Sequence, residues 1–149
     1  MATLLIVAHA PLAAALKAVA THAFPELTAT MQALDVGPAD QPEEVEQRLR
    51  ALLAQPADAD TLILTDVFGA TPCNAAMRVA DGLHVRVVAG VNVPMLWRAL
   101  CYRAEPLDAL VGRAVGGATQ GVMQVAITRP QNQSTKTAAD DQDTNQHQQ

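Results

Sequence analysis

Residues 61–76 read TLILTDVFGATPCNAA, an apolar run followed by a short polar stretch and the start of a second apolar segment. The run TLIL shows no alternation of polar and apolar residues, which is typical of a strand buried on both faces of a parallel sheet. Thr71 is a good helix N-cap and Pro72 favours the first helical position, so a helix is predicted to begin there. The segment predicts a strand, a turn and a helix, the repeating unit of α/β proteins.

The same alternation of strand and helix extends in both directions from this segment. Strands alternating with helices of this length predict an α/β fold. We expect an open, mostly parallel sheet of flavodoxin-like order 2-1-3-4 with helices on both faces. Further strands are predicted at 3–8 (TLLIVA), 29–36 (ATMQALDV), 85–90 (VRVVAG) and 121–127 (GVMQVAI), the last preceded by Gly116 and Gly117.

Helices are predicted between these strands where apolar residues recur at helical spacing. Pro11 can occupy a first helical turn, and it is followed at that spacing by Leu12, Leu16, Val19 and Ala20. Asp40 is the predicted N-cap of the next helix, whose first turn is acidic. The remaining helices are predicted at 72–82, 95–103 and near 106–115.

At 149 residues the chain is long enough for one domain with a substantial core. Phe, Trp and Tyr make up only 3% of it, so the core must consist mainly of Ala, Val and Leu. From Pro130 onward the composition is polar, and such a segment cannot bury enough apolar surface to fold. We therefore expect a folded domain over 1–129 and a disordered polar tail over 130–149.

Charge and cysteine content argue against several classes of function. A net charge of −5 with only ten Lys and Arg residues disfavours a nucleic-acid-binding surface. The N-terminus has no basic region, and its apolar run is too short for a signal peptide or a membrane span, so a cytoplasmic location is predicted. Cys73 and Cys101 form no CxxC pair and are predicted to be buried free thiols, which fits a reducing compartment.

Two ionisable residues stand at the ends of predicted strands. His9 follows strand 3–8, and Asp66 ends the third strand, 57 positions further along the chain. Ligands of open α/β sheets bind beyond the carboxyl ends of the strands where the strand order reverses, here between the first and third strands. The two side chains are therefore expected to meet. A carboxylate that accepts from one ring N–H would fix the tautomer of His9 and activate the other nitrogen as a nucleophile.

The residues after Asp66 predict an anion site. A helix that starts at Thr71 presents unpaired N–H groups and the positive end of its dipole, and Gly69 lets the preceding backbone turn closely. A nucleophilic histidine, an orienting carboxylate and an anion cradle together predict transient phosphorylation of His9. No acid–base partner for hydrolysis is visible in the sequence, which suits a carrier that keeps its phosphoryl group until a partner takes it.

These segments resemble the IIA component of the mannose family of the bacterial phosphoenolpyruvate-dependent sugar phosphotransferase system. The resemblance covers residues 3 to about 127 and is carried by LLIVAHA, TLILTDVFGATPCNAA and VVAGVNVPML. The last two are specific, because Asp-x-x-Gly-x-Thr-Pro-x-Asn is followed about 15 residues later by Gly-Val-Asn-x-Pro-Met.

The resemblance implies a role for each candidate residue. His9 would receive the phosphoryl group from the carrier protein HPr and pass it to a IIB component, with Asp66 as its hydrogen-bonded partner. Thr71 would contact the phosphoryl group through its hydroxyl and amide, next to Gly69 and Ala70. The resemblance also implies a homodimer in which a C-terminal strand, here 121–127, is exchanged. Separately, we expect no cofactor and no metal.

This chain departs from the family pattern at several points. Ala10 and Pro11 follow the histidine where glycine is frequent, and Ala70 replaces a common glycine. Some relatives continue through a linker into a IIB domain, whereas this sequence continues into the polar tail. A regulatory target is therefore as compatible with the sequence as sugar uptake, with membrane association only through a transporter complex. A related fold serves phosphotransfer to dihydroxyacetone kinase.

Four other interpretations fit the sequence less well. A response-regulator receiver needs an acidic pair after its first strand and a lysine near its last, and neither is present. A non-enzymatic flavin- or nucleotide-binding module is disfavoured by the few aromatics and the absence of G-x-G-x-x-G. A metal site at His9 and Asp66 lacks a third ligand, and a serine hydrolase lacks G-x-S-x-G. His22 and His84 are predicted to be ordinary core or surface residues.

Overall fold

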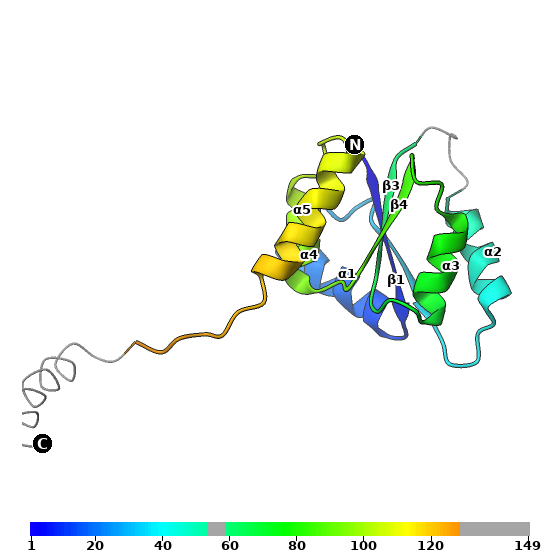
Figure 1. Ribbon diagram of the computed structural model, residues 1–149, viewed down its shortest axis with the longest axis horizontal. Helices are drawn as coiled ribbons and strands as arrows, with labels where there is room; N and C mark the ends of the chain where they lie inside the picture. The colour runs from blue at the N-terminus through cyan, green and yellow to red at the C-terminus, as the bar shows by residue number, and fades with distance from the viewer. Residues whose placement is uncertain (54–58, 129–149) are drawn as a thin grey trace, which may run out of the picture.

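The computed structural model describes residues 1–53 and 59–128 and has a four-stranded parallel sheet at its centre (Figure 1). The strand order is β2-β1-β3-β4, so the predicted order 2-1-3-4 is confirmed. All three neighbouring pairs are parallel, with Val7 opposite Thr65 in the central pair. The strands are β1 (Thr3–His9), β2 (Gln32–Val36), β3 (Thr61–Thr65) and β4 (Val85–Ala89).

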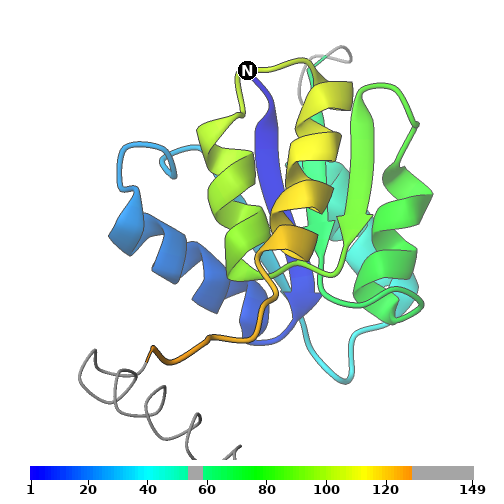
Figure 2. The ribbon, with the colours of Figure 1, turned by 60° about the vertical axis from the view of Figure 1, so that its left-hand side comes forward.

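Helices cover both faces of the sheet, as predicted (Figure 1 and Figure 2). One face carries α1, α4 and α5, and the opposite face carries α2 and α3. The predicted α/β class is therefore confirmed. The helices are α1 (Leu12–Ala23), α2 (Pro42–Leu52), α3 (Thr71–Val79), α4 (Val93–Cys101) and α5 (Leu107–Gln120).

The central strands divide their side chains between two hydrophobic cores. Successive residues of a strand point to opposite faces of the sheet, so Leu4 and Ile6 join the core under α1, α4 and α5, while Leu5 and Val7 join the core under α2 and α3. All four are fully buried. Burial on both faces explains why the apolar runs in the sequence are continuous.

Some predicted boundaries and burial assignments are wrong. A turn closed by Met31 N–H and the Thr28 carbonyl delays β2 to Gln32. Asp40 does not cap α2, because its carboxylate accepts from Gly37 N–H at 2.8 Å. Gln41 and Glu44 instead form a capping box at the start of that helix.

In α1, Leu16 and Ala20 are buried but Leu12 and Val19 are exposed, and Cys101 is exposed rather than buried.

Helix α5 continues through Gly116 and Gly117, which the sequence analysis placed in a break before a strand. The reason is close packing against α4. A Cβ atom at Gly117 would lie 2.8 Å from the Cβ of Arg98 and 3.1 Å from the carbonyl oxygen of Pro94. Glycine at this position therefore serves helix contact rather than helix termination.

We expect Gly117→Ala to destabilise the protein by about 1–3 kcal/mol, because the added methyl group forces α4 and α5 apart. Gly112→Ala is the matched control. Gly112 lies in the same helix as Gly117, but a Cβ atom at Gly112 would meet nothing within 4 Å. This control is expected to be neutral or to stabilise by up to about 1 kcal/mol. Urea denaturation of both variants measures the difference, and equal effects would contradict the packing explanation.

The predicted strand at 121–127 is not part of this sheet. Gly121 ends α5 in a turn, and residues 122–128 have no regular secondary structure and lead away from the body of the protein (Figure 1). A strand needs a neighbouring strand for its backbone hydrogen bonds, and this segment has none among the described residues. The predicted tail, 130–149, lies entirely outside the described residues.

Candidate functional site

His9 and Asp66 meet at the carboxyl edge of the sheet, where β1 and β3 lie side by side. The ring nitrogen Nδ1 of His9 is 2.7 Å from Oδ2 of Asp66. The same oxygen accepts the backbone N–H of His9 at 3.0 Å. Asp66 thus holds the histidine by its main chain and by its ring. The contact that the sequence analysis predicted between the two strand ends is present.

The contact determines which ring nitrogen of His9 is available for chemistry. An ionised carboxylate only accepts hydrogen bonds, so Nδ1 carries the proton that it shares with Asp66. The lone pair of a neutral ring is then on Nε2. The His9 side chain is 52% exposed and that of Asp66 only 13%. The ring nitrogen that keeps its lone pair is therefore on the more exposed partner, and the anchoring carboxylate is largely covered.

The charge of Asp66 is stabilised by its surroundings. Partial burial raises the pKa of Asp66, but hydrogen bonds from the backbone N–H of His9, the His9 ring and the backbone N–H of Val67 lower it. The net effect is a pKa below the ordinary value of 3.8. Asp66 is therefore ionised at neutral pH, as its role as hydrogen-bond acceptor requires.

The lowered pKa of Asp66 predicts how stability depends on pH. A carboxyl group with a depressed folded-state pKa stabilises the protein above its unfolded pKa and loses that contribution as pH falls through the folded value. We expect the difference in unfolding free energy between wild type and Asp66→Asn to shrink as pH falls below 3.8. Urea titrations at several pH values between about 6 and 2 measure it. A difference that is the same throughout would contradict an ionised, hydrogen-bonded Asp66.

The loop from Asp66 to α3 turns as the sequence predicts, but helix α3 begins one residue earlier than predicted. Gly69 has a φ of 93°, a conformation that favours glycine. Ala70 is the N-cap and Thr71 the first helical residue, so Thr71 was wrongly predicted as the cap. Ala70 has no side-chain acceptor to cap the helix. The first N–H groups of α3 have no carbonyl one turn earlier to bind, so they remain donors for an anion.

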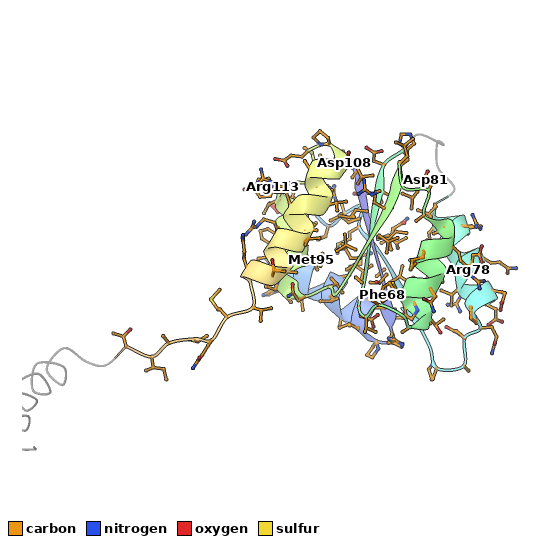
Figure 3. All side chains as sticks on the ribbon, viewed as in Figure 1. Phe68, Arg78, Asp81, Met95, Asp108 and Arg113 are labelled. Carbon is orange, nitrogen blue, oxygen red and sulfur yellow. The ribbon has the colours of Figure 1, made fainter. Side chains whose placement is uncertain are left out.

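An exposed apolar pair stands at the start of the same loop. Phe68 is 74% exposed and Val67 51% exposed. Figure 3 labels Phe68 on the loop that precedes α3. Both residues directly follow Asp66 in the sequence, so an apolar surface adjoins the exposed histidine. Large apolar side chains exposed next to a polar site are a feature of protein-binding surfaces.

Strand β2 contributes a side chain that was not predicted from the sequence to belong near the site. The carboxylate oxygen Oδ1 of Asp35 accepts the backbone N–H groups of Ala13 and Ala14, at 2.9 and 3.2 Å. These groups belong to the first turn of α1, which directly follows His9 and has no side-chain cap of its own. An aspartate at the end of a strand beside the candidate histidine was the available signal, because β2 was predicted to adjoin β1.

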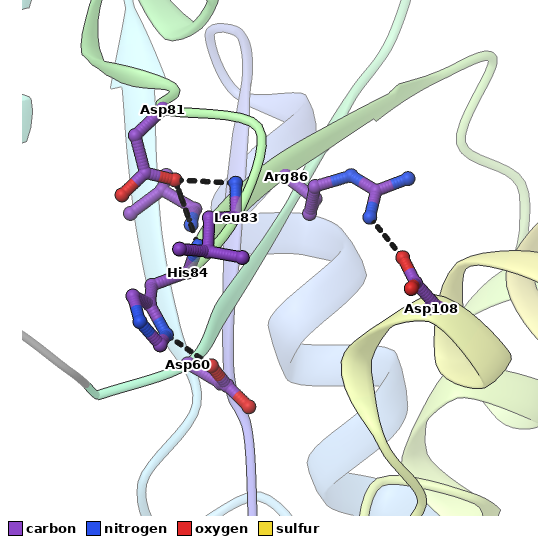
Figure 4. Close-up of polar contacts among 7 residues, drawn as sticks. Asp60, Asp81, Leu83, His84, Arg86 and Asp108 are labelled. Atoms are coloured by element: carbon purple, nitrogen blue, oxygen red, sulfur yellow. Dashed lines mark hydrogen bonds and ion pairs between the residues drawn. The ribbon is translucent and has the colours of Figure 1, made fainter.

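A second histidine–aspartate contact lies at the opposite edge of the sheet (Figure 4). His84 Nδ1 is 2.9 Å from Oδ1 of Asp60, and the two residues precede β4 and β3. Asp81 accepts three backbone N–H groups in the same turn. These contacts tie the amino ends of two strands together, so His84 lies away from the candidate site, as predicted.

Residues 1–53 and 59–128 contain neither a cluster of metal ligands nor a membrane-spanning helix. No group of three or more His, Cys, Asp or Glu side chains there is arranged to hold a metal ion. No helix in that part of the chain is long and apolar enough to cross a membrane.

The fold and the site define a flavodoxin-like α/β protein with a carboxylate-held, exposed histidine at the point where the strand order reverses. Residues 3–115 match the family model described as the PTS system fructose IIA component. The chain belongs to this family of IIA components of the sugar phosphotransferase system. The resemblance to a mannose-family IIA component is thereby confirmed.

Individual relatives agree with this assignment. The mannose-specific EIIAB component of Escherichia coli K12 is 38% identical over 93 residues, which are 60% of this chain and 29% of that protein. The fructose-specific EIIA component of Bacillus subtilis 168 is 40% identical over 55 residues, 36% of this chain and 38% of that protein. The matched region thus spans less than two fifths of the length of either relative.

Solved structures show the same fold. The mannose/sorbose-specific IIA subunit from Enterococcus faecalis superposes with a TM-score of 0.80 at 26% identity, over 87% of this chain and 98% of that one. The phosphotransferase system component EIIA from Streptococcus agalactiae gives a TM-score of 0.74 at 21% identity, over 83% and 97% of the two chains. At that lower identity the likeness supports the fold alone.

Proposed function

We propose that the protein is a phosphocarrier that accepts a phosphoryl group on Nε2 of His9 and passes it to a partner protein. The observation that carries the proposal is the 2.7 Å contact between His9 Nδ1 and Asp66 Oδ2, made by a ring that is otherwise half exposed. It leaves the lone pair on the other nitrogen of a half-exposed ring, which a donor protein can approach. Family membership supports the same conclusion.

The transfer is a displacement at phosphorus. The lone pair of His9 Nε2 forms a bond to the phosphorus carried by the donor protein, and the bond between that phosphorus and the donor side chain breaks. The donor side chain retains that electron pair. The His9 ring becomes more positive during the step, and the charge of Asp66 beside Nδ1 stabilises it. The Nδ1 proton stays in the hydrogen bond, so no general base is required.

The start of α3 is proposed to bind the phosphoryl oxygens. The N–H groups of Ala70 and Thr71 and the hydroxyl of Thr71 are the candidate donors, with Gly69 shaping the turn that presents them. Asp66 immediately precedes this loop, which links the anion donors to the residue that holds His9. A doubly charged phosphoryl group is best placed near such unpaired amides.

The partners are proposed from the family resemblance and from the surface around the site. HPr is the expected donor, and a IIB component or a regulatory target protein is the expected acceptor. Both must bring a phosphorylated or accepting side chain to His9, so both must contact the adjoining loop. Phe68 and Val67 give that loop an apolar contact surface.

Phe68→Ser is expected to raise the KM for the phosphorylated donor by about tenfold, because an exposed aromatic side chain at an interface centre contributes on the order of 1–2 kcal/mol. The rate at saturating donor is expected to stay within about twofold of wild type, since Phe68 has no hydrogen bond to His9 or Asp66 among those of the described chain. Met77→Ser is a control, because Met77 is an exposed apolar residue as well, at 51%, but lies further along α3. An unchanged KM would contradict docking at this loop.

A homodimer with exchange of the 121–127 segment remains part of the proposal. Strand β4 is an edge strand of the sheet, and exposed edges pair readily with another chain. The segment leading away from α5 is extended, and Val122, Met123, Val125 and Ile127 are exposed. Pairing of this segment with β4 of a second copy would give the edge of β4 hydrogen-bond partners and cover the exposed apolar side chains of the segment. Analytical ultracentrifugation of the full chain, compared with a variant truncated after Gly121, tests this pairing.

Incubation with phosphoenolpyruvate, enzyme I and HPr tests the function. We expect one phosphoryl group per chain, stable in base and labile in acid, as an N–P bond to histidine requires. Omission of HPr should abolish the labelling. A base-labile acyl phosphate would place the chemistry on a carboxylate such as Asp66, and no labelling would contradict the proposal altogether.

A further inference from the structure

The connection between β1 and α1 carries the candidate nucleophile, and it is held from both sides. On the β3 side, Asp66 holds the backbone and the ring of His9. On the β2 side, the Ala10 N–H donates to the Val36 carbonyl at 2.9 Å. The next contact from β2 is made by a side chain, the carboxylate of Asp35.

Asp35 caps a helix to which it does not belong. Its Oδ1 accepts from Ala13 N–H at 2.9 Å and from Ala14 N–H at 3.2 Å. The α1 residues themselves offer no substitute, because the N-cap is Pro11 and the first turn contains no acidic side chain. One charged group from β2 therefore satisfies two of the amides that an uncapped helix leaves unpaired.

The position of Asp35 relative to His9 is fixed by the sheet. Asp35 lies opposite Ala8 in the parallel pairing of β1 and β2, and His9 lies opposite Val36. Only Ala10, Pro11 and Leu12 separate His9 from the first amide that Asp35 binds. A connection this short cannot absorb a shift of α1 without moving His9, so the Asp35 contact bears on the position of the ring.

We propose that Asp35 is a positioning residue for His9. By fixing the start of α1 it holds the His9 backbone at the place where Nδ1 meets Asp66 and Nε2 faces the donor. It also occupies two α1 amides with a carboxylate, so these amides cannot bind a phosphoryl group carried by His9. The phosphoryl group is then left with the amides at the start of α3. This proposal rests on the proposed phosphocarrier function for its kinetic consequences.

Asp35→Ala removes the cap, and Asp35→Asn keeps an oxygen that can accept both hydrogen bonds. We expect Asp35→Ala to lower the rate at saturating phosphorylated donor by roughly 10- to 100-fold with KM within about twofold of wild type. Asp35→Asn should retain most of the rate. Asp81→Ala is the matched control, because Asp81 also accepts backbone N–H groups, at the opposite edge of the sheet.

A second readout needs no phosphoryl donor. The ¹⁵N chemical shifts of the His9 ring report the tautomer held by Asp66, and at a pH where the ring is neutral Asp35→Ala should move them toward those of a free imidazole. Asp35→Asn and Asp81→Ala should leave them as in wild type. If Asp35→Ala does not fold, Asp35→Ser, which is too short to reach both amides, takes its place in both measurements.

The outcomes separate the two proposals. If Asp35→Ala has the same ring shifts and the same transfer rate as wild type, the positioning role is overturned. It is also overturned if Asp81→Ala changes both quantities as much as Asp35→Ala does, because that result would indicate a general loss of stability. If wild type itself is not phosphorylated, the phosphocarrier function fails, while the ring shifts still decide whether Asp35 positions His9.

Discussion

Replacing His9 by glutamine is expected to abolish phosphorylation by phosphorylated HPr. Glutamine has an amide in place of the imidazole and therefore offers no nucleophilic nitrogen to phosphorus. The fold is expected to persist, because His9 is at the exposed end of β1 and lies outside both hydrophobic cores. The loss should exceed the detection range of a labelling assay, which makes this the largest effect among the predictions.

His22→Gln is the control for that experiment. His22 is an exposed histidine in the last turn of α1, so its replacement removes the same chemical group away from the site. We expect full labelling of this variant. Residual labelling of His9→Gln, measured on protein with a wild-type circular dichroism spectrum, would show that another residue accepts the phosphoryl group.

Asp66→Asn is expected to slow phosphoryl transfer by roughly 10²- to 10³-fold without abolishing it. The asparagine oxygen can still accept the Nδ1 proton, but it lacks the charge that stabilises the ring as it becomes positive. The asparagine can also present its NH₂ group to the ring, which would favour the tautomer with the lone pair on Nδ1. Rapid-quench measurement of the transfer rate at saturating donor separates this effect from weaker docking.

Asp60→Asn is the matched control, because Asp60 contacts the ring of His84 in the same way at the opposite edge of the sheet. Its transfer rate should equal that of wild type. A rate for Asp66→Asn within about twofold of wild type would mean that Asp66 neither orients nor activates His9. Circular dichroism and the urea midpoint of each variant show whether the fold has changed.

The sheet was predictable from the sequence because its central strands are buried on both faces. Continuous apolar runs such as 3–8 and 61–64 can hardly be accommodated except between two helical layers. The alternation of these runs with helical segments then restricted the topology to a parallel sheet. Since ligand sites in such sheets lie where the strand order reverses, the meeting of His9 and Asp66 could be predicted as well.

The errors occur where tertiary contacts outweigh local preference. Gly116 and Gly117 resemble a helix end, but the close approach of α4 and α5 requires a residue without a side chain at Gly117. Thr71 has the chemistry of a cap, but the turn at Gly69 brings Ala70 into that position. The capping role of Asp35 leaves no local pattern, because the side chain caps a helix from another strand, and the place of Asp35 near the end of β2 was the signal available for it.

The predicted strand at 121–127 illustrates a further limit of the sequence. Its apolar residues have strand-forming character, but strand formation depends on a pairing partner that lies outside the pattern itself. Within the described chain the segment is extended and exposed. The same sequence pattern is thus compatible with a strand where a pairing partner is present and with an extended segment where none is.

Asp66 holds Nδ1 of His9, and we propose that this contact leaves Nε2 as the nucleophile. The most direct test is NMR of the phosphorylated protein with ¹⁵N-labelled histidine, in which the coupling to phosphorus identifies the substituted nitrogen. We expect one phosphorylated histidine, His9, with phosphorus bonded to Nε2. Phosphorus bonded to Nδ1 of His9, to another histidine or to a carboxylate oxygen would contradict it.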